Sequence, residues 1–379
     1  MIVLGMLSKK KKRNISLFVF IFSSILYVLP KISFAISQIS LVFEQLNWIL
    51  ILLVYVMYTG LFHYADKILV KIVLFIVVLI LVNPNFINGV LGFGAITVLV
   101  TLLLRLLFLG SVELNGGDIK RFSYVFALLL VFYDLFVPKY GFNTNNIGGT
   151  YCTFFILGSI WVNIRNLKHV VIFVLMAILA SKGIIESDTR TSFGVVFLYF
   201  VIRLLPSCFL KNKFVFWFTF ICMTIGAIVY ALFYVDLYLH GEVLDIFGNS
   251  NKKFFSGREQ IWLELLTRFA EQPLVGIGSH INLISFDSMQ THNNMLNHLV
   301  VYGLPIFLLI ILMLVNVFKK IRLLLDDHIS YSSFCALIAV FFGGYNENNA
   351  LIFPTFILLA FVYSRKNRFN LIYRVNDYT

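Results

Sequence analysis

Two arginines and one histidine in this chain have the chemistry needed to act on an anionic substrate. Arg190 stands in the run SDTRTSF, Arg258 follows Ser256-Gly257, and His292 precedes Asn293. A guanidinium presents a planar fork of N–H donors that holds a phosphate or a carboxylate through two hydrogen bonds. An imidazole accepts a proton near neutral pH. These residue types suit a reaction at a charged group.

Each of the three residues also has an ordinary explanation. Arg190 is beside an apolar segment, where a terminal arginine often extends to the membrane interface, although the small residues that follow it would let it face inward. His292 fits a solvated loop. Arg258 fits an ordinary first-turn residue of the expected helix. A cation is nevertheless disfavoured there by about 0.3–1 kcal/mol, so a bound anion would explain its position.

The histidines and cysteines do not predict a metal site. His298 comes six residues after His292, hence on another face of a helix, and no carboxylate accompanies the pair. The four cysteines, at positions 152, 208, 222 and 335, have no metal-ligand spacing. We expect neither a metal nor a cofactor, and no disulfide framework.

The stretch from Ser256 to Pro305 must position the arginine and the histidine. Ser256 and Glu259 form a capping box, which predicts an amphipathic helix near residues 257–272 that ends at Pro273. Its apolar stripe is Ile261, Trp262, Leu265, Leu266 and Phe269. Such a helix is too short to cross a bilayer, so we expect it along the interface or in an outer cap. Gly276-Ile277-Gly278 predicts a tight turn.

The composition sets the class of the protein. Of 379 residues, 60% are hydrophobic and 13% are charged, whereas soluble domains carry about 25% charged residues. The chain is therefore predicted to be an all-α, polytopic integral membrane protein, in one membrane domain without internal repeats. About 12 segments are long enough to span a bilayer: 15–33, 41–61, 68–83, 89–109, 122–138, 150–164, 169–183, 192–208, 214–235, 294–318, 331–345 and 350–363.

Lysine and arginine predict the orientation of these spans. They cluster before the first span and after every second span that follows, which is typical of cytoplasmic loops. Both termini are then cytoplasmic, and the net charge of +12 is explained by contact with anionic lipid rather than nucleic acid. The segments 139–150, 185–192 and 236–293 face outward. The last is a large extracytoplasmic loop between the ninth and tenth spans.

Four short motifs in this region resemble those of the O-antigen polymerase and O-antigen ligase superfamily. In order, they are Thr189-Arg190, Ser256-Gly257-Arg258 with Trp262, Pro273-Leu274-Val275-Gly276-Ile277-Gly278, and His292-Asn293 with Gly303. The resemblance covers about residues 189–305. It departs from the usual pattern at Thr189, where serine is usual, and at Ile306, where ligases commonly have a small residue.

The resemblance implies a metal-independent glycosyltransferase that acts at the outer face of the bacterial plasma (inner) membrane. It would polymerise undecaprenyl-diphosphate-linked oligosaccharide repeat units into O-antigen or capsular polysaccharide. The implied roles are a base for His292, a diphosphate clamp for Arg190 and Arg258, and substrate binding for Asn293, Trp262, Gly276 and Gly278. The implied partners are lipid-linked glycans, membrane lipids, a repeat-unit flippase and a chain-length regulator, without nucleic acid.

Two other functions fit parts of the sequence. An O-antigen ligase would transfer the glycan to lipid A core, and Ile306 weakens that reading. A transporter or flippase of lipid-linked or small solutes predicts charges deep within several spans. Here the ionisable residues cluster at span ends and in the outer loop, with Arg105 and Arg203 near the cytoplasmic side. The sequence therefore favours the polymerase.

Overall fold

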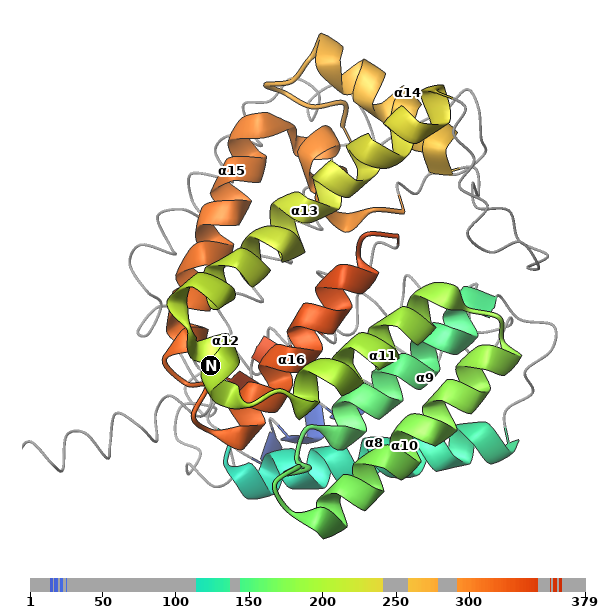
Figure 1. The fold of residues 1–379 in the computed structure, drawn as a ribbon, viewed down its shortest axis with the longest axis vertical. Helices are drawn as coiled ribbons and strands as arrows, with labels where there is room; N and C mark the ends of the chain where they lie inside the picture. The colour runs from blue at the N-terminus through green and yellow to red at the C-terminus, as the bar shows by residue number, and fades with distance from the viewer. Residues whose placement is uncertain are drawn as a thin grey trace, which may run out of the picture.

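The computed structural model describes residues 114–136, 144–240, 258–278 and 292–346, with isolated positions within 14–25 and 355–362 (Figure 1). The expected spans between residues 41 and 109 lie outside the described residues, as do 241–257 and 279–291 of the expected outer loop. The predictions about these segments, the capping role of Ser256 included, are untested.

Every regular element in the described ranges is a helix. The helices are α8 (Gly116–Phe136), α9 (Thr144–Ser159), α10 (Leu167–Glu186), α11 (Arg190–Leu204), α12 (Ser207–Lys211), α13 (Lys213–Leu239), α14 (Arg258–Glu271), α15 (Asn294–Arg322) and α16 (His328–Gly343). Three of them, α10, α13 and α15, are long and apolar enough to cross a membrane. The prediction of an all-α protein with membrane-spanning helices is thus confirmed at this level.

Asparagine and aspartate side chains start most of the long helices. Asn166, Asn212 and Asp327 accept hydrogen bonds from the backbone N–H groups of Lys168, Phe214 and Ser330 at the first turns of α10, α13 and α16. At the start of α8, Asn115 and Asp118 cap each other reciprocally. These local bonds satisfy backbone donors that a helix leaves unpaired, so the helix starts are readable from the sequence.

The helices form two packed groups joined by α16. Helices α8, α9, α10 and α11 pack on one another, while α13 packs on α14 and α15. Helix α16 contacts both α11 and α13, and it lies between the two groups in Figure 1. Phe334 of α16 stacks on Phe216 of α13 at 5.1 Å, and Phe318 of α15 packs edge-on against Phe220 at 4.9 Å. Close aromatic packing of this kind holds helices together where no hydrophobic effect acts between them.

The basic connections lie at one end of the bundle. The buried Arg203 guanidinium donates to the carbonyl of Val162 at 2.6 Å, which joins the end of α11 to the end of α9. Arg322 Nε donates to the carbonyl of Lys211 at 3.3 Å, and Lys211 forms an ion pair with Asp326. Helices α11 and α15 run toward this basic end, so Arg190 and Asn294, their first residues, lie away from it.

Candidate functional site

Helix α14 brings Arg258 to the C-terminal half of α13. The helix occupies Arg258–Glu271, within the range that the capping pattern predicted, and Ile261, Trp262 and Leu265 of its apolar stripe are buried. Trp262 is fully buried, with its ring 5.9 Å from that of Tyr230 and 5.3 Å from that of Tyr234. Trp262 therefore docks α14 on α13, which favours a structural role over the glycan contact that the resemblance implied.

Arg258, at the first position of α14, is next to the same tyrosine. Arg258 precedes Trp262 by one turn on the same face of α14, and the Trp262 ring packs on Tyr230, so the charge of the guanidinium acts on the Tyr230 hydroxyl. Tyr230 in turn donates from its hydroxyl to Asn346 Oδ1 at 3.3 Å. Because Trp262 docks α14 on Tyr230, the same contact also determines where Arg258, one turn earlier on this helix, lies.

The Pro273–Gly278 segment completes a break in α15. At Gly303 the chain leaves the helical conformation, with φ 79° and ψ 167°, a region that only glycine adopts readily. In a continuous helix, the carbonyl of Val300 would accept from Leu304 N and that of Val301 from residue 305, which is a proline without an N–H group. Instead, Ile277 N donates to Val300 O at 2.7 Å and Gly278 N donates to Val301 O at 3.2 Å.

A third hydrogen bond between the two segments has its donor in α15, because Leu304 N donates to the carbonyl of Pro273 at 2.8 Å. An unpaired buried backbone group costs about 1–3 kcal/mol, so the break is tolerable only with this partner segment in place. The expected continuous span 294–318 is therefore corrected: α15 reaches Arg322 and consists of two half-helices. Two motifs that are distant in the sequence form one structural unit, in which Gly276 and Gly278 have backbone roles.

His292 lies directly before α15 in an uncommon backbone conformation. Its φ of 50° is left-handed, which costs about 1–2 kcal/mol for a residue with a side chain and persists only where its surroundings fix it. The neighbouring Asn293 supplies that fixation. Its Oδ1 accepts from Leu296 N at 3.0 Å as the N-cap of α15, and its Nδ2 donates to the carbonyl of Ala227 at 2.8 Å. The half-buried His292 is therefore held at a defined place beside α13.

Asn293 itself is fully buried. Its amide joins α15 to α13, which favours a positioning role for this residue over the substrate contact that the resemblance implied. The motif His292-Asn293 then divides into the histidine, to which the resemblance gives the role of base, and the asparagine that holds its backbone in place. That division is invisible in the sequence because both residues are polar and adjacent.

A turn after α16, which sequence reasoning missed, contacts the start of α15 and one face of α13. The carbonyl of Gly344 accepts from Asn294 N at 2.9 Å, next to His292. The Tyr345 hydroxyl donates to the carbonyl of Cys222, and Asn346 Oδ1 accepts from Tyr230. We call Gly343–Asn346 the α16 turn. The run GGYN was the only available signal for it, because two glycines followed by an asparagine are typical of a turn.

One face of α13 organises these contacts. Cys222, Gly226 and Tyr230 are four residues apart and so lie in one row along the helix. Tyr345 contacts the first two, and a Cβ on Gly226 would stand 2.5 Å from the Tyr345 hydroxyl. Ala227, beside this row, binds Asn293. The same surface therefore sets the positions of the segment that carries His292 and of the helix that carries Arg258.

Arg190 is on the other side of α16. It is exposed as the first residue of α11, after Thr189, which is buried and makes no side-chain cap bond. The Thr189 hydroxyl instead shares a hydrogen bond of 2.9 Å with Ser187, and its side chain fills the space above Gly148. One turn along α11, Val195 packs on Gly343 of the α16 turn. The α16 turn therefore connects α11 with the histidine and with the second arginine.

His298 is buried in the first half of α15, away from the surface. Its ring stacks on that of Tyr302 at 5.8 Å, and within the described structure neither ring nitrogen has a hydrogen-bond partner. Asn294 Nδ2, one turn earlier, is likewise buried without a partner there. No three potential metal ligands come together in the part of the chain that the structure describes. The sequence prediction of a site without metal or cofactor stays a prediction.

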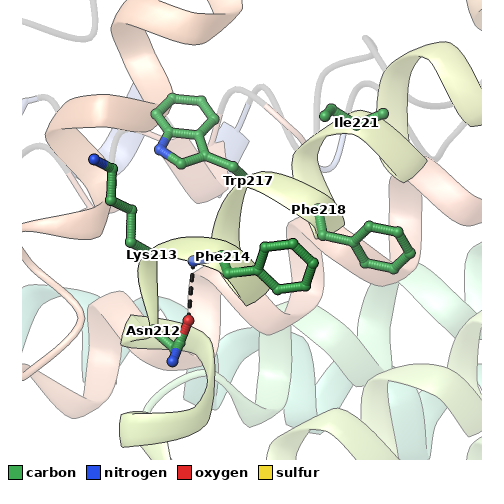
Figure 2. Close-up of a pocket in the computed structure, with 6 residues that line it drawn as sticks. All are labelled: Asn212, Lys213, Phe214, Trp217, Phe218 and Ile221. Carbon is green, nitrogen blue, oxygen red and sulfur yellow. Dashed lines mark hydrogen bonds between the residues drawn. The ribbon is translucent and has the colours of Figure 1, made fainter.

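Two apolar hollows lie elsewhere on the described surface. Figure 2 shows one of about 610 Å³, lined by Asn212, Lys213, Phe214, Trp217, Phe218 and Ile221 of a single helix face. The dashed bond there is the α13 cap, from Phe214 N to Asn212. The hollow is at the basic end of α13, remote from Tyr230. A second hollow of about 450 Å³ lies between α10 and α11, with Lys182 among its lining residues. Neither includes His292 or Arg258.

No family model matches this chain, and no curated protein does either.

Proposed function

We propose that this protein polymerises undecaprenyl-diphosphate-linked oligosaccharide repeat units into O-antigen or capsular polysaccharide. In the reaction, a hydroxyl oxygen of the acceptor glycan forms a bond to the anomeric carbon of the donor glycan. The bond between that carbon and the diphosphate oxygen breaks, the diphosphate leaves with the electron pair, and the hydroxyl proton passes to a base. No oxidant, reductant or cofactor is needed for this balance.

The observation that carries the proposal is the shared support of the motif residues on α13. Asn293 fixes the segment that carries His292 through the carbonyl of Ala227, and Tyr230, less than one helical turn further on, packs on Trp262 of the helix that begins at Arg258. Motifs placed by resemblance alone would have no reason to meet in space. The contact between the Pro273–Gly278 segment and Gly303 supports the same assignment, because it joins a third motif to the one that contains His292, Asn293 and Gly303.

The proposed roles follow from what each group does best. The leaving diphosphate gains negative charge in the transition state, and a guanidinium held in place stabilises that charge through paired hydrogen bonds. Arg258 and Arg190 take this role. His292 takes the proton of the attacking hydroxyl, a task suited to an imidazole. Asn293 and Trp262 fix the geometry, which matters because a misplaced group loses much of the rate.

The location also belongs to the proposal. We propose a multi-pass protein of the bacterial plasma membrane with about twelve spans, both termini in the cytoplasm and the site on the extracytoplasmic face. The arrangement of the described part supports this orientation, since Arg165, Lys168, Lys211, Lys319 and Lys320 occupy the loops and helix ends opposite to Arg190 and Arg258. A repeat-unit flippase would supply the substrate there, and a chain-length regulator would act with the polymerase.

The test is reconstitution with the natural substrate. Lipid-linked repeat units extracted from a strain that lacks this protein are mixed with the purified full-length protein in detergent, and products are separated on a gel. Polymerisation gives a ladder of glycans that differ by one repeat unit. A single transfer to added lipid A core would establish a ligase instead. Unchanged substrate, with translocation of the lipid-linked unit in proteoliposomes, would establish a flippase and overturn the proposal.

A further inference from the structure

The α16 turn and Tyr230 make a contact with the proposed site that none of the four motifs contains. The Tyr230 hydroxyl donates to Asn346 Oδ1 at 3.3 Å, and the Tyr230 ring packs on Trp262, one turn after Arg258 on the same face of α14. The charge of the Arg258 guanidinium acts on this hydroxyl. A hydroxyl that donates its O–H group to one acceptor can still accept a hydrogen bond from a second group through its lone pairs. A phenol oxygen fixed in this way is suited to hold a neighbouring cation.

The two residues are held independently of Arg258. The Tyr230 ring packs at 5.9 Å from Trp262 and at 5.5 Å from Tyr345. Tyr345 stacks on Phe342 at 5.1 Å and donates to the carbonyl of Cys222. Asn346 follows directly in the α16 turn. Neither residue therefore depends on the arginine for its own position, as a positioning device requires.

We infer that Tyr230 and Asn346 form a positioning pair that orients Arg258 toward the diphosphate of the lipid-linked substrate. The inference rests on the proposed diphosphate-binding role of Arg258. Asn346 fixes the direction of the Tyr230 O–H bond, and the Tyr230 oxygen then restrains the guanidinium. Because the carbonyl of Gly344 in the same turn holds Asn294 N, the α16 turn relates the position of the arginine to that of His292.

The pair is tested with full-length protein in detergent, through the equilibrium binding of radiolabelled undecaprenyl diphosphate. Tyr230→Phe keeps the ring on Trp262 and removes only the hydroxyl, and Asn346→Ala removes only the acceptor. Each variant should bind the probe about 10- to 100-fold more weakly, as expected when a hydrogen bond to a charged group is lost. The affinity of the double variant for the probe should equal that of whichever single variant binds the probe more weakly, because the two residues act as one unit.

The matched control is Tyr331→Phe. It also removes a buried tyrosine hydroxyl, one that donates to the carbonyl of Leu205 at 2.6 Å at the basic end of the bundle. It should bind the probe as the wild type does, at a similar cost in thermal stability. In the Arg258→Lys background, Tyr230→Phe should have no further effect on binding. A purely structural role for Tyr230 would instead add its loss to that of Arg258→Lys.

Polymer formation, measured in parallel, separates the two proposals. Wild-type binding and turnover in both variants would overturn the positioning pair and leave the polymerase proposal intact. Binding by the wild type without any polymer would overturn the polymerase, and the binding series alone would then decide on the pair. If the wild-type protein neither bound the probe nor made polymer, both inferences would be overturned.

Discussion

Gly276 and Gly303 lie backbone against backbone, and neither position has room for a side chain. A Cβ on Gly276 would stand 2.5 Å from Gly303 N, and one on Gly303 would collide with the carbonyl group of Leu274. Both residues also have positive φ values, 73° and 79°. This contact lets the Pro273–Gly278 segment reach the carbonyls that the break in α15 exposes, so the two glycines determine whether the first half-helix of α15 is held in place.

Substitution of these glycines should therefore destabilise the protein strongly. Gly276→Ala and Gly303→Ala should each lower the free energy of unfolding by more than about 3 kcal/mol, through steric overlap added to backbone strain. Gly278→Ala is the matched control: its φ is also 79°, but no atom of the described residues lies within 4 Å of its Cβ position, so only the strain of about 1–2 kcal/mol applies. Thermal unfolding in detergent measures the difference. Equal losses at the three positions would contradict the close contact.

The two proposed clamp residues are tested by exchange of arginine for lysine. Arg190→Lys and Arg258→Lys keep the positive charge but lose the planar fork, so each should abolish most polymer in a complemented deletion strain at matched protein levels. Arg268→Lys is the control on the same helix as Arg258. Arg268 pairs with Glu264 and should tolerate lysine. Normal long-chain polysaccharide from either clamp variant would remove that arginine from the site.

The proposed orientation predicts which end of the bundle is accessible from outside the cell. Glu271, at the exposed end of α14, should react as cysteine with a membrane-impermeant maleimide in intact cells. If the cell has an outer membrane, it is first permeabilised. Leu323, which is exposed between α15 and α16, should react as cysteine only after lysis. Both variants carry Cys208→Ser, because Cys208 is exposed. The reverse labelling pattern would invert the orientation of the described helices.

Local sequence signals predicted the helices of this structure better than the contacts between them. Helix α14, the turn after Pro273 and the apolar helices α10 and α13 follow from capping residues, glycines and hydrophobic runs. Each of those signals acts within a few residues, so one chain is enough to read them. The break of α15 at Gly303 was partly readable, because glycine followed closely by proline disfavours a continuous helix.

The roles of Trp262, Asn293 and the α16 turn were not readable in this way. Trp262 and Asn293 have side chains that bind glycans as readily as they pack or cap helices. The choice depends on Tyr230, Tyr234 and Ala227, which belong to another helix. Asn346 meets Tyr230 only because α16 packs on α13. Contacts between segments so distant in the chain leave no periodicity in a single sequence.

The final prediction separates the two histidines at the start of α15. His292→Ala should reduce polymer formation about 10²- to 10⁴-fold, the usual contribution of a general base, and leave single repeat units on the lipid carrier. His298 should be dispensable for the reaction, because it is buried against Tyr302 and deeper in α15.

Two replacements of His298 also test whether its surroundings are apolar. Glutamine brings new polar groups into a place where, among the described residues, the imidazole nitrogens have no partner, so His298→Gln should lower stability. His298→Leu fills the space with apolar atoms and should leave stability equal or improved. Both variants should give a full ladder on a gel of surface polysaccharide from the complemented deletion strain. A full ladder from His292→Ala would exclude His292 as the base, and a ladder lost only when His298 is replaced would move the chemistry into the first half-helix of α15.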